Sequence, residues 1–326
     1  MSSPRVPLAA ALAAGPVVLD GGLSTELESR GHDVSSALWS ARLLRDDPQA
    51  IADAHAAFAA AGAQVATTAS YQATLPGFAA AGIDAAEAAT LIARAVQLAR
   101  DGMAAAGRSG WVAGSVGPYG ASLADGSEYR GDYVAGTSVT ALREFHRPRL
   151  ELLAAAGADV LACETVPAAA EVEALLAELD RLGVPAWLSL TTVTGDDGVP
   201  RTRRGEPLAD VLAMTRDVPA VVAVGVNCTD PAGVVPAVRV VAATGGRPAV
   251  AYPNSGEVWD AGARCWTGSP GVGDVGGWLS AGARMVGGCC RVRPADVRAI
   301  AETATGAVTL RSAGGGEIAE KSATTG

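Results

Sequence analysis

Short apolar runs alternate along most of the chain with longer stretches rich in Ala and Leu, and this alternation restricts the possible folds more than any other feature. Apolar runs of about four to eight residues are typical of buried strands, whereas the longer stretches have the spacing of helices. We expect strands at Val17–Asp20, Gln64–Ser70, Trp111–Val116, Asp159–Glu164, Ala186–Thr192, Val221–Cys228, Ala249–Pro253 and Arg284–Cys289.

The stretches between these runs supply a helix after nearly every strand. We expect helices at Pro48–Ala61, Ala85–Ala105, Val139–Ala156, Ala168–Leu182, Leu208–Arg216, Pro231–Ala243 and Gly276–Ala281, and a final helix from Pro294 to about Thr303. Eight strands that alternate with helices are the count of a (β/α)8 barrel, a fold of about 250 residues. We therefore predict an α/β fold with a single (β/α)8 TIM barrel over residues 1–307; a doubly wound open sheet is the competing topology.

The two ends of the chain carry different signals. From Val308 onward Ser, Gly, Thr and charged residues dominate, so we expect residues 308–326 to form a disordered C-terminal tail. The apolar stretch from Leu8 to Ala14 follows Arg5 and imitates a short signal peptide, but a predicted strand begins almost at once, at Val17. Five cysteines, an odd number without a regular framework, also suit a reducing compartment, so we expect a cytoplasmic protein.

The charge and hydropathy of the chain limit its partners. The formal net charge is −9 and the sequence pI is about 4.9, and no basic stripe is present that could neutralise phosphates, which argues against a nucleic-acid partner. No apolar run approaches the roughly 18 residues that a membrane span requires, which argues against a membrane partner.

Three cysteines lie where predicted strands end: Cys228 after one apolar run, and Cys289 with Cys290 after another. Barrel enzymes place their chemistry at the carboxyl ends of the strands, and a catalytic zinc site uses three protein ligands with one position left open. The cysteines therefore predict a zinc site, with buried apolar thiols or a strained vicinal disulfide as the alternatives. We expect Cys163 to fill the core and Cys265 to be incidental to the chemistry.

Two carboxylates, Asp20 and Glu164, lie at the same predicted rim. They could be a general acid/base pair, a magnesium site or a clamp for an ammonium group. Nearby thiolates favour the clamp, because zinc prefers sulfur ligands and itself ionises a bound thiol. The histidines add little: we expect His32 and His55 in loop or helix surface and His146 in a structural position.

Several motifs together resemble the homocysteine S-methyltransferase family, the zinc-dependent barrel enzymes that methylate homocysteine to methionine. The matching segments are Asp20–Leu27, Ala69–Thr74, Gly114–Tyr133, Phe145–Arg149, Ala162–Thr165, Gly225–Cys228, Tyr252–Glu257 and Gly287–Cys290. One departure follows the cysteine pair: the family often continues Gly-Thr-x-Pro-x-His, whereas this chain has Arg291-Val292-Arg293-Pro294-Ala295-Asp296, which puts the shape of that loop in doubt.

The resemblance implies roles for individual residues. It makes Cys228, Cys289 and Cys290 the ligands of one Zn²⁺ ion per chain. It assigns the substrate amino group to Asp20 and Glu164, the substrate carboxylate to backbone amides near Gly21 and Gly22, and positions near the substrate to Tyr71 and Asn254.

The expected activity is zinc-dependent methyl transfer from S-methylmethionine, or S-adenosylmethionine, to the thiolate of homocysteine. Aromatic faces such as Tyr71, Tyr119 or Trp39 could contact the positive sulfonium group of the donor. Three alternatives stay open: betaine as donor, a selenol as acceptor, and a zinc- or redox-responsive thiol protein without turnover. The sequence also leaves the number of subunits open.

Overall fold

The strands form one parallel eight-stranded sheet, wrapped into a nearly closed barrel. The computed structural model describes residues 6–36, 38–244, 246–260, 265–268 and 270–314. The sheet order is β1-β12-β9-β8-β5-β4-β3-β2. The strands are β1 (Val17–Val18), β2 (Val65–Thr67), β3 (Trp111–Val116), β4 (Val160–Val166), β5 (Ala186–Leu190), β8 (Val221–Asn227), β9 (Ala249–Tyr252) and β12 (Ala283–Val286).

Gln64 joins the two end strands of this order. Its backbone N–H donates to Val18 O at 2.8 Å, and its side-chain Oε1 accepts from Val18 N at 2.9 Å. These bonds bring β2 beside β1 and so nearly close the ring of strands. The predicted (β/α)8 barrel is confirmed, and the open-sheet topology is wrong.

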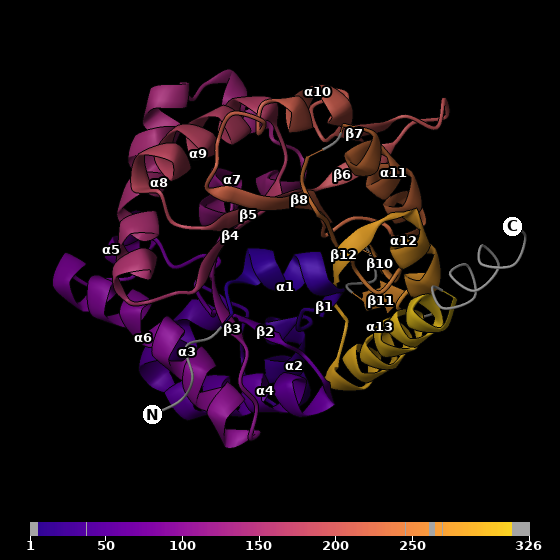
Figure 1. Cartoon of the computed structure of the whole chain (residues 1–326). Helices are drawn as coiled ribbons and strands as arrows, with labels where there is room; N and C mark the ends of the chain where they lie inside the picture. The colour runs from indigo at the N-terminus through magenta and orange to yellow at the C-terminus, as the bar shows by residue number, and fades with distance from the viewer. Residues whose placement is uncertain (1–5, 37, 245, 261–264, 269, 315–326) are drawn as a thin grey trace, which may run out of the picture.

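Helices form an outer ring around the strands (Figure 1). The main helices are α4 (Pro48–Ala61), α6 (Ala85–Ala105), α8 (Val139–Ala155), α9 (Ala169–Leu182), α10 (Leu208–Ala213), α11 (Val234–Thr244), α12 (Val275–Ala281) and α13 (Pro294–Gly314). Shorter helices lie in the connections: α2 (Leu23–Ser29), α3 (Ser40–Asp46), α5 (Leu75–Ala80), α7 (Tyr119–Leu123), η1 (Ser127–Tyr129), η2 (Asp132–Ala135) and η3 (Pro231–Gly233).

Helix starts and ends agree with local chemistry. Pro48 opens α4, where its missing N–H costs nothing, and Asp47 caps the helix by accepting from Ala50 N at 3.2 Å. Gly62 and Gly282 end α4 and α12 with φ of 116° and 119°, a region that other residues rarely adopt.

The C-terminal helix is longer than expected. We placed its end near Thr303 and the start of a tail at Val308, but α13 continues to Gly314. The domain boundary at residue 307 and the disordered tail stay predictions, and residues 315–326 lie outside the described residues.

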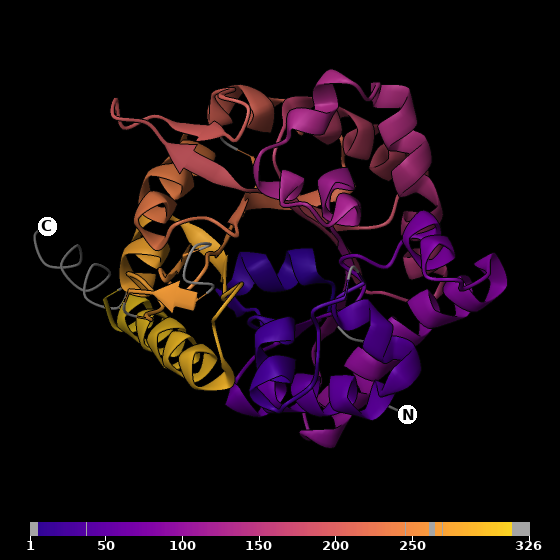
Figure 2. The same cartoon turned by 180° about the vertical axis from the view of Figure 1, so that it is seen from behind.

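Two short hairpins were not anticipated: β6 (Thr192–Thr194) with β7 (Pro200–Thr202), and β10 (Val258–Asp260) with β11 (Cys265–Thr267). Figure 2 shows the β6–β7 hairpin projecting beyond the ring of helices. Each of these strands has three residues, too few to show an apolar pattern in the sequence. Cys265 lies in β11 rather than in an open loop; its side chain lies outside the described residues.

The apolar stretch near the N-terminus is a helix, α1 (Leu8–Ala14), that lies in the middle of the ring in Figure 1. Leu8 and Leu12 are buried in the cluster that fills the barrel interior, together with Val65 and Trp187. The hydrophobic face that imitates a signal peptide therefore packs inside the barrel. None of the helices that the structure describes is long and apolar enough to cross a membrane.

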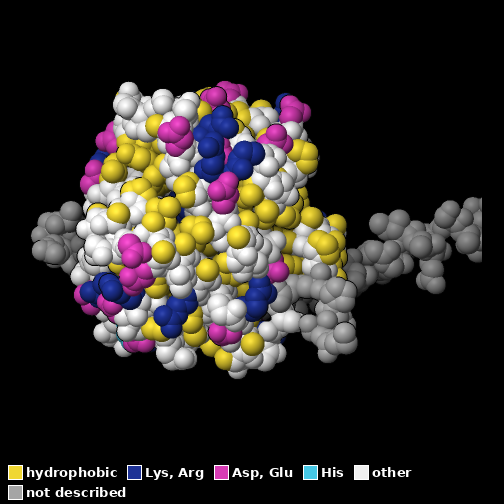
Figure 3. All heavy atoms as spheres, turned by 90° about the vertical axis from the view of Figure 1, so that its left-hand side faces the viewer, with side chains coloured by type: hydrophobic (Ala, Val, Ile, Leu, Met, Phe, Trp, Pro, Cys, Tyr) yellow, Lys and Arg dark blue, Asp and Glu magenta, His cyan; other side chains and the backbone are white. Residues whose placement is uncertain are grey.

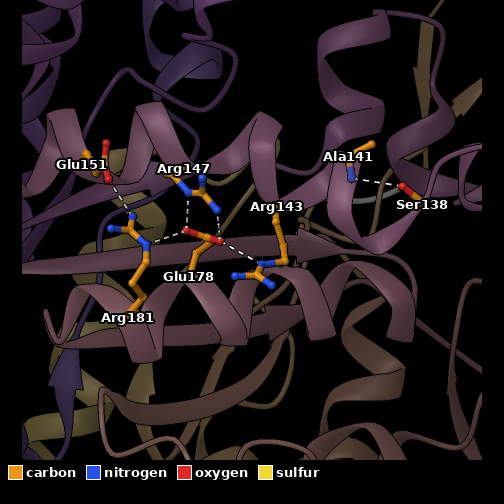
Figure 4. Close-up of polar contacts among 7 residues, drawn as sticks. All are labelled: Ser138, Ala141, Arg143, Arg147, Glu151, Glu178 and Arg181. Atoms are coloured by element: carbon orange, nitrogen blue, oxygen red, sulfur yellow. Dashed lines mark hydrogen bonds and ion pairs between the residues drawn. The ribbon is translucent and has the colours of Figure 1, made fainter.

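Helices α8 and α9 are joined by a network of charged side chains (Figure 4). Glu178 on α9 has no exposed side-chain surface and accepts from Arg143, Arg147 and Arg181 at 2.9 Å each. These bonds, first of all those of Arg147, lower the pKa of Glu178 to about 2. On the face that carries these helices, basic side chains lie in small groups beside acidic ones (Figure 3).

Candidate active site

A pocket opens where the barrel strands end. Its volume, counted out to the mouth, is about 810 Å³. Its wall comprises Asp20 to Thr25, Trp39, Ser40, Thr67, Thr68, Tyr71, Gln72, Ser115, Glu128, Tyr129, Glu164, Thr165, Cys228, Tyr252, Gly288, Cys289 and Cys290. These residues come from the ends of most of the barrel strands, as expected for a barrel enzyme.

Three cysteine sulfurs meet on one wall of this pocket. The Sγ atoms of Cys228, Cys289 and Cys290 all lie within 4.8 Å of one another, and those of Cys228 and Cys290 are 3.8 Å apart. Cys228 follows β8 directly, with a left-handed φ of 46° that turns the chain at the end of the strand. The two others follow β12, which ends at Val286, so the alternation of side chains in a strand does not separate them.

The loop after β12 is held by backbone hydrogen bonds. Gly288 N donates to Asp20 O at 3.0 Å, and Cys289 N donates to Pro253 O at 2.8 Å. Cys290 N donates to Asn254 Oδ1 at 3.2 Å. A Cβ at position 288 would collide with Val292, so glycine is needed for this close approach.

The sulfur geometry fits a tetrahedral metal ion. With Zn–S bonds of about 2.3 Å, two ligands of a tetrahedral zinc ion lie about 3.8 Å apart, the separation of the Cys228 and Cys290 sulfurs. Hydrogen bonding with Cys228 has the largest effect on the Cys289 thiol and, with hydrogen bonding to Cys290 and burial, raises its pKa well above the usual range. The thiols of Cys228 and Cys289 in turn lower the pKa of Cys290. A cation held among the three sulfurs would favour their ionised forms.

Two carboxylates face the same pocket, and each is held by two donors. Asp20 Oδ2 accepts from Thr67 N at 2.6 Å, and Asp20 Oδ1 accepts from Thr67 Oγ1 at 2.8 Å. Glu164 Oε1 accepts from the Ser115 hydroxyl, and Glu164 Oε2 accepts from Tyr252 OH at 3.1 Å. Burial raises the pKa of both Asp20 and Glu164 to about 7. A bound cation would favour their ionised forms.

A buried network behind Glu164 fixes its position. Tyr252 OH accepts from Trp187 Nε1 at 2.9 Å and lies 2.6 Å from Ser189 Oγ. Ser189 Oγ in turn donates to Asn227 Oδ1 at 2.8 Å. The network consists of buried groups from neighbouring strands, and Glu164 is tied to it through Tyr252.

Arg149 supports the opposite wall. It is buried on α8 and donates to Tyr71 O at 2.6 Å and to Gly117 O at 2.5 Å. Tyr71 and Trp39 line the pocket, as we expected for aromatic residues near a ligand. Tyr119 does not: its ring packs against those of Tyr133 and Phe145, with centroids 5.4 and 4.9 Å away.

A family model described as homocysteine S-methyltransferase matches residues 17–304. The chain belongs to the homocysteine S-methyltransferase family. It is 45% identical over 296 residues to the homocysteine S-methyltransferase of Escherichia coli (strain K12), a match that covers 87% of this chain and 94% of that protein. It is 39% identical over 303 residues to homocysteine S-methyltransferase YbgG of Bacillus subtilis (strain 168), covering 87% of this chain and 93% of that protein.

Solved structures of the homocysteine methyltransferase MmuM from Escherichia coli have the same fold. The metallated form superposes with a TM-score of 0.79 at 44% identity, covering 91% of this chain and 99% of that one. The oxidised form superposes with a TM-score of 0.80 at 43% identity, covering the same shares of the two chains. A metallated member of the family thus shares the fold on which the three-cysteine group stands here.

The loop after the cysteine pair departs from the family pattern but is well anchored. Arg291 has a left-handed φ of 68°, and its N–H donates to Thr25 Oγ1 at 3.0 Å. Its guanidinium pairs with Glu257, with Nε 3.1 Å from Oε2. This ion pair ties the loop to the segment after β9.

Gly21, Gly22 and Asn254 differ in their access to the pocket. Gly22 N donates to Val292 O at 2.9 Å, so this amide is already engaged; Gly21 also lines the pocket. Asn254 is not among the lining residues, and its side-chain Oδ1 accepts a hydrogen bond from Cys290 N. Contact of Gly21, Gly22 or Asn254 with a substrate stays a prediction.

The histidines and Cys163 lie away from the pocket wall. His55 is buried on α4, so our placement of it on the surface was wrong; the apolar packing of α4 against α6 covers it and lowers its pKa to about 4. His146 is buried in a structural position, with Nε2 2.8 Å from Glu171 Oε1. Cys163 is buried in β4, as expected for a core residue.

Residues 128 and 129 were missed by reasoning from strand ends, because they lie on the η1 turn between β3 and β4. The hydroxyl of Tyr129 lies 3.8 Å from Cys228 Sγ and 3.9 Å from Cys290 Sγ. Glu128 lines the same pocket. The glycine-rich segment Gly114–Tyr133, which carries part of the family resemblance, was the signal that could have led to them.

Proposed function

We propose that this chain transfers a methyl group from a sulfonium donor to the thiolate of homocysteine and so forms methionine. The observation that carries the proposal is the meeting of three sulfurs and two buried carboxylates in one pocket. Thiolates suit a metal-bound sulfur substrate, and paired carboxylates suit the ammonium group of an amino acid. The family to which the chain belongs supports the same reaction.

We propose that the metal is zinc, held by Cys228, Cys289 and Cys290. Thiolate ligands favour zinc over harder cations, and the sulfur separation fits its tetrahedral geometry. Cys228, Cys289 and Cys290 would hold the zinc ion and leave a fourth position open, where zinc would favour the thiolate form of an incoming thiol.

The protein groups around this position orient the amino acid. The ionised carboxylates of Asp20 and Glu164 would hold the ammonium group of homocysteine between them. The Thr67, Ser115 and Tyr252 donors leave the carboxylates little freedom, so the ammonium group is fixed relative to the sulfurs. The substrate carboxylate would face the turn at Gly21, at the start of α2.

The transfer is a displacement at the methyl carbon. The new bond forms between the homocysteine sulfur and this carbon, the bond from the carbon to the donor sulfur breaks, and its electron pair stays on the donor as a neutral thioether. The protein contributes chiefly alignment of the three atoms. Trp39 and Tyr71 could contact the sulfonium through their aromatic faces, a contact worth about 0.5–2 kcal/mol. We propose S-methylmethionine, or S-adenosylmethionine, as the donor.

We also propose that the protein works in the cytoplasm. Cys163, Cys228, Cys289 and Cys290 are free thiols in the structure, and a reducing compartment keeps thiols available for a metal.

A donor panel tests the proposal. Zinc-loaded protein is incubated with homocysteine and, separately, S-methylmethionine, S-adenosylmethionine or betaine, and methionine is quantified. We expect methionine from at least one sulfonium donor and no methionine from Cys228→Ala. The matched control is Cys163→Ala, which removes a buried thiol outside the pocket and should keep its activity. Turnover of betaine alone would contradict the donor class, and full activity in metal-free protein would refute the mechanism.

A further inference from the structure

The η1 turn is a part of the pocket wall that hydrogen bonds and close packing hold in place. Ser127 N donates to Asp125 Oδ1 at 2.9 Å, and Ser127 Oγ donates to Gly120 O at 3.2 Å. A Cβ at Gly120 would lie 2.6 Å from Glu128 N, so the turn packs directly on the start of the preceding segment. Because the turn is held on both sides, the side chains that it carries have defined positions.

Glu128 on this turn presents a third carboxylate to the pocket. The residue is 5% exposed, and its Oε2 is buried without a hydrogen-bond partner among the described residues. Asp20 and Glu164, by contrast, each accept two hydrogen bonds. The adjacent cation, Arg130, is engaged by Asp132 at 3.1 Å and lies 3.9 Å from Asp125.

A buried carboxylate oxygen without a partner is costly, so a ligand that supplies positive charge is the simplest explanation for it. Burial also raises the pKa of Glu128, and a cation beside it would favour the ionised form. The proposed reaction brings two cationic groups into the pocket: the ammonium group of homocysteine and the charged end of the donor. Asp20 and Glu164 account for the first.

The position of the η1 turn indicates that Glu128 faces the second of these groups, the charged end of the donor. Tyr129, the next residue, has its hydroxyl 3.8 Å from Cys228 Sγ, so this turn borders the space directly beside the sulfur cluster. Alignment for displacement requires the donor sulfur to lie close to the acceptor sulfur, separated from it by the methyl group. The positive charge of the donor therefore falls next to the η1 turn.

We infer that Glu128 is a donor-binding residue that recognises the positive sulfonium group of the methyl donor. This inference rests on the proposed function and adds a specific residue to the side of the site that the donor occupies. The carboxylate attracts the sulfonium before transfer, and this attraction disappears once the donor has become a neutral thioether. Glu128 therefore discriminates the charged donor from its neutral product.

The test uses trimethylsulfonium, which carries the cationic sulfur without an amino or carboxylate group. Zinc-loaded wild-type protein and Glu128→Gln are compared in three constants: the KM of the sulfonium donor, the KM of homocysteine, and the inhibition constant of trimethylsulfonium against the donor. We expect the KM of the sulfonium donor and the inhibition constant of trimethylsulfonium to rise about tenfold in Glu128→Gln, as for loss of one partly buried charge pair. The homocysteine KM and the zinc content should stay within about twofold of wild type.

Three further variants complete the design. Glu128→Asp keeps the charge and should retain inhibition by trimethylsulfonium within about threefold of wild type. Glu173→Gln makes the same charge change at an exposed position of α9 and should change none of the constants. If Glu128→Gln does not fold, Glu128→Ala takes its place and must show the same losses.

The possible outcomes separate this inference from the proposed function. If wild-type protein makes no methionine from any sulfonium donor, the proposed function fails. If wild-type protein turns over and Glu128→Gln binds donor and trimethylsulfonium as wild type does, only the role of Glu128 is overturned. A rise confined to the homocysteine KM would also overturn it, because Glu128 would then serve the amino acid.

Discussion

The pKa values of Asp20 and Glu164 predict that the amino-acid site loses affinity just below neutral pH. Burial raises the pKa of each to about 7, above the ordinary range of a carboxyl group. The ionised form, which binds an ammonium group, is therefore present above about pH 7 and is lost as the pH falls through that value. An exposed carboxylate would instead stay ionised down to about pH 5.

The magnitude follows from the titration. A group with a pKa of 7 is about nine-tenths ionised at pH 8 and about one-tenth ionised at pH 6, so affinity that needs one ionised carboxylate falls about tenfold over this interval. If binding needs both carboxylates ionised, the fall approaches a hundredfold.

Methionine is the ligand of choice for this assay, because it has the amino-acid group of homocysteine but no thiol whose own ionisation would add a pH dependence. Its dissociation constant is measured by calorimetry at pH 8, 7 and 6 with metal-free protein, the state to which these pKa values refer. Asp20→Asn, whose amide oxygen can still accept from Thr67 N, serves as the comparison. We expect weaker binding and a shallower pH dependence in this variant. A constant affinity between pH 8 and 6, or the same fall in wild type and variant, would refute the reasoning.

Three further predictions concern single side chains. Glu178→Gln should lower the free energy of unfolding at pH 7 by about 2–3 kcal/mol, allowing for the half-exposed arginine partners. More than half of this difference should vanish by pH 3, because the stabilisation by Glu178 is complete above the ordinary pKa of a glutamate and is lost as the pH falls toward the lowered pKa of about 2. Urea titrations at both pH values check it. Leu12→Ala should lower the free energy of unfolding by about 3 kcal/mol because it opens a cavity inside the barrel. Leu123→Ala, at a side chain 44% exposed, should lower it by less than about 0.5 kcal/mol, and equal losses in the two variants would contradict the packing of α1. Thr67→Val removes the hydroxyl bond to Asp20 and should raise the homocysteine KM about tenfold with zinc content unchanged; an unchanged KM would show that this bond does not support the site.

The barrel and the sulfur cluster could be predicted from the sequence because both depend on the regular alternation of strands and helices. Strand β9 alone separates β8 from β12 in the sheet, so residues at the carboxyl ends of β8 and β12 are brought close together although about sixty positions separate them in the chain. Once the strands were identified, Cys228 and the Cys289–Cys290 pair had to approach each other. Asp20 and Glu164 were found by the same argument.

The features that were missed depend on contacts without a sequence period. Glu128 and Tyr129 reach the pocket through a connection whose course is set by the packing of Gly120 on the η1 turn. The interior position of α1 was missed because an apolar helix has the same composition whether it packs in a barrel or imitates a signal peptide. His55 looked like a surface residue because its burial comes from the packing of α4 against α6.

The direct test of the account is the metal content of single cysteine variants together with the number of sulfur ligands from X-ray absorption. We predict about one zinc ion per chain with three protein sulfurs in wild type, and joint loss of bound zinc and methyl transfer in Cys228→Ala, Cys289→Ala and Cys290→Ala but not in Cys163→Ala. A protein that keeps its zinc and its rate of methionine formation after removal of any one of the three sulfurs would contradict the account.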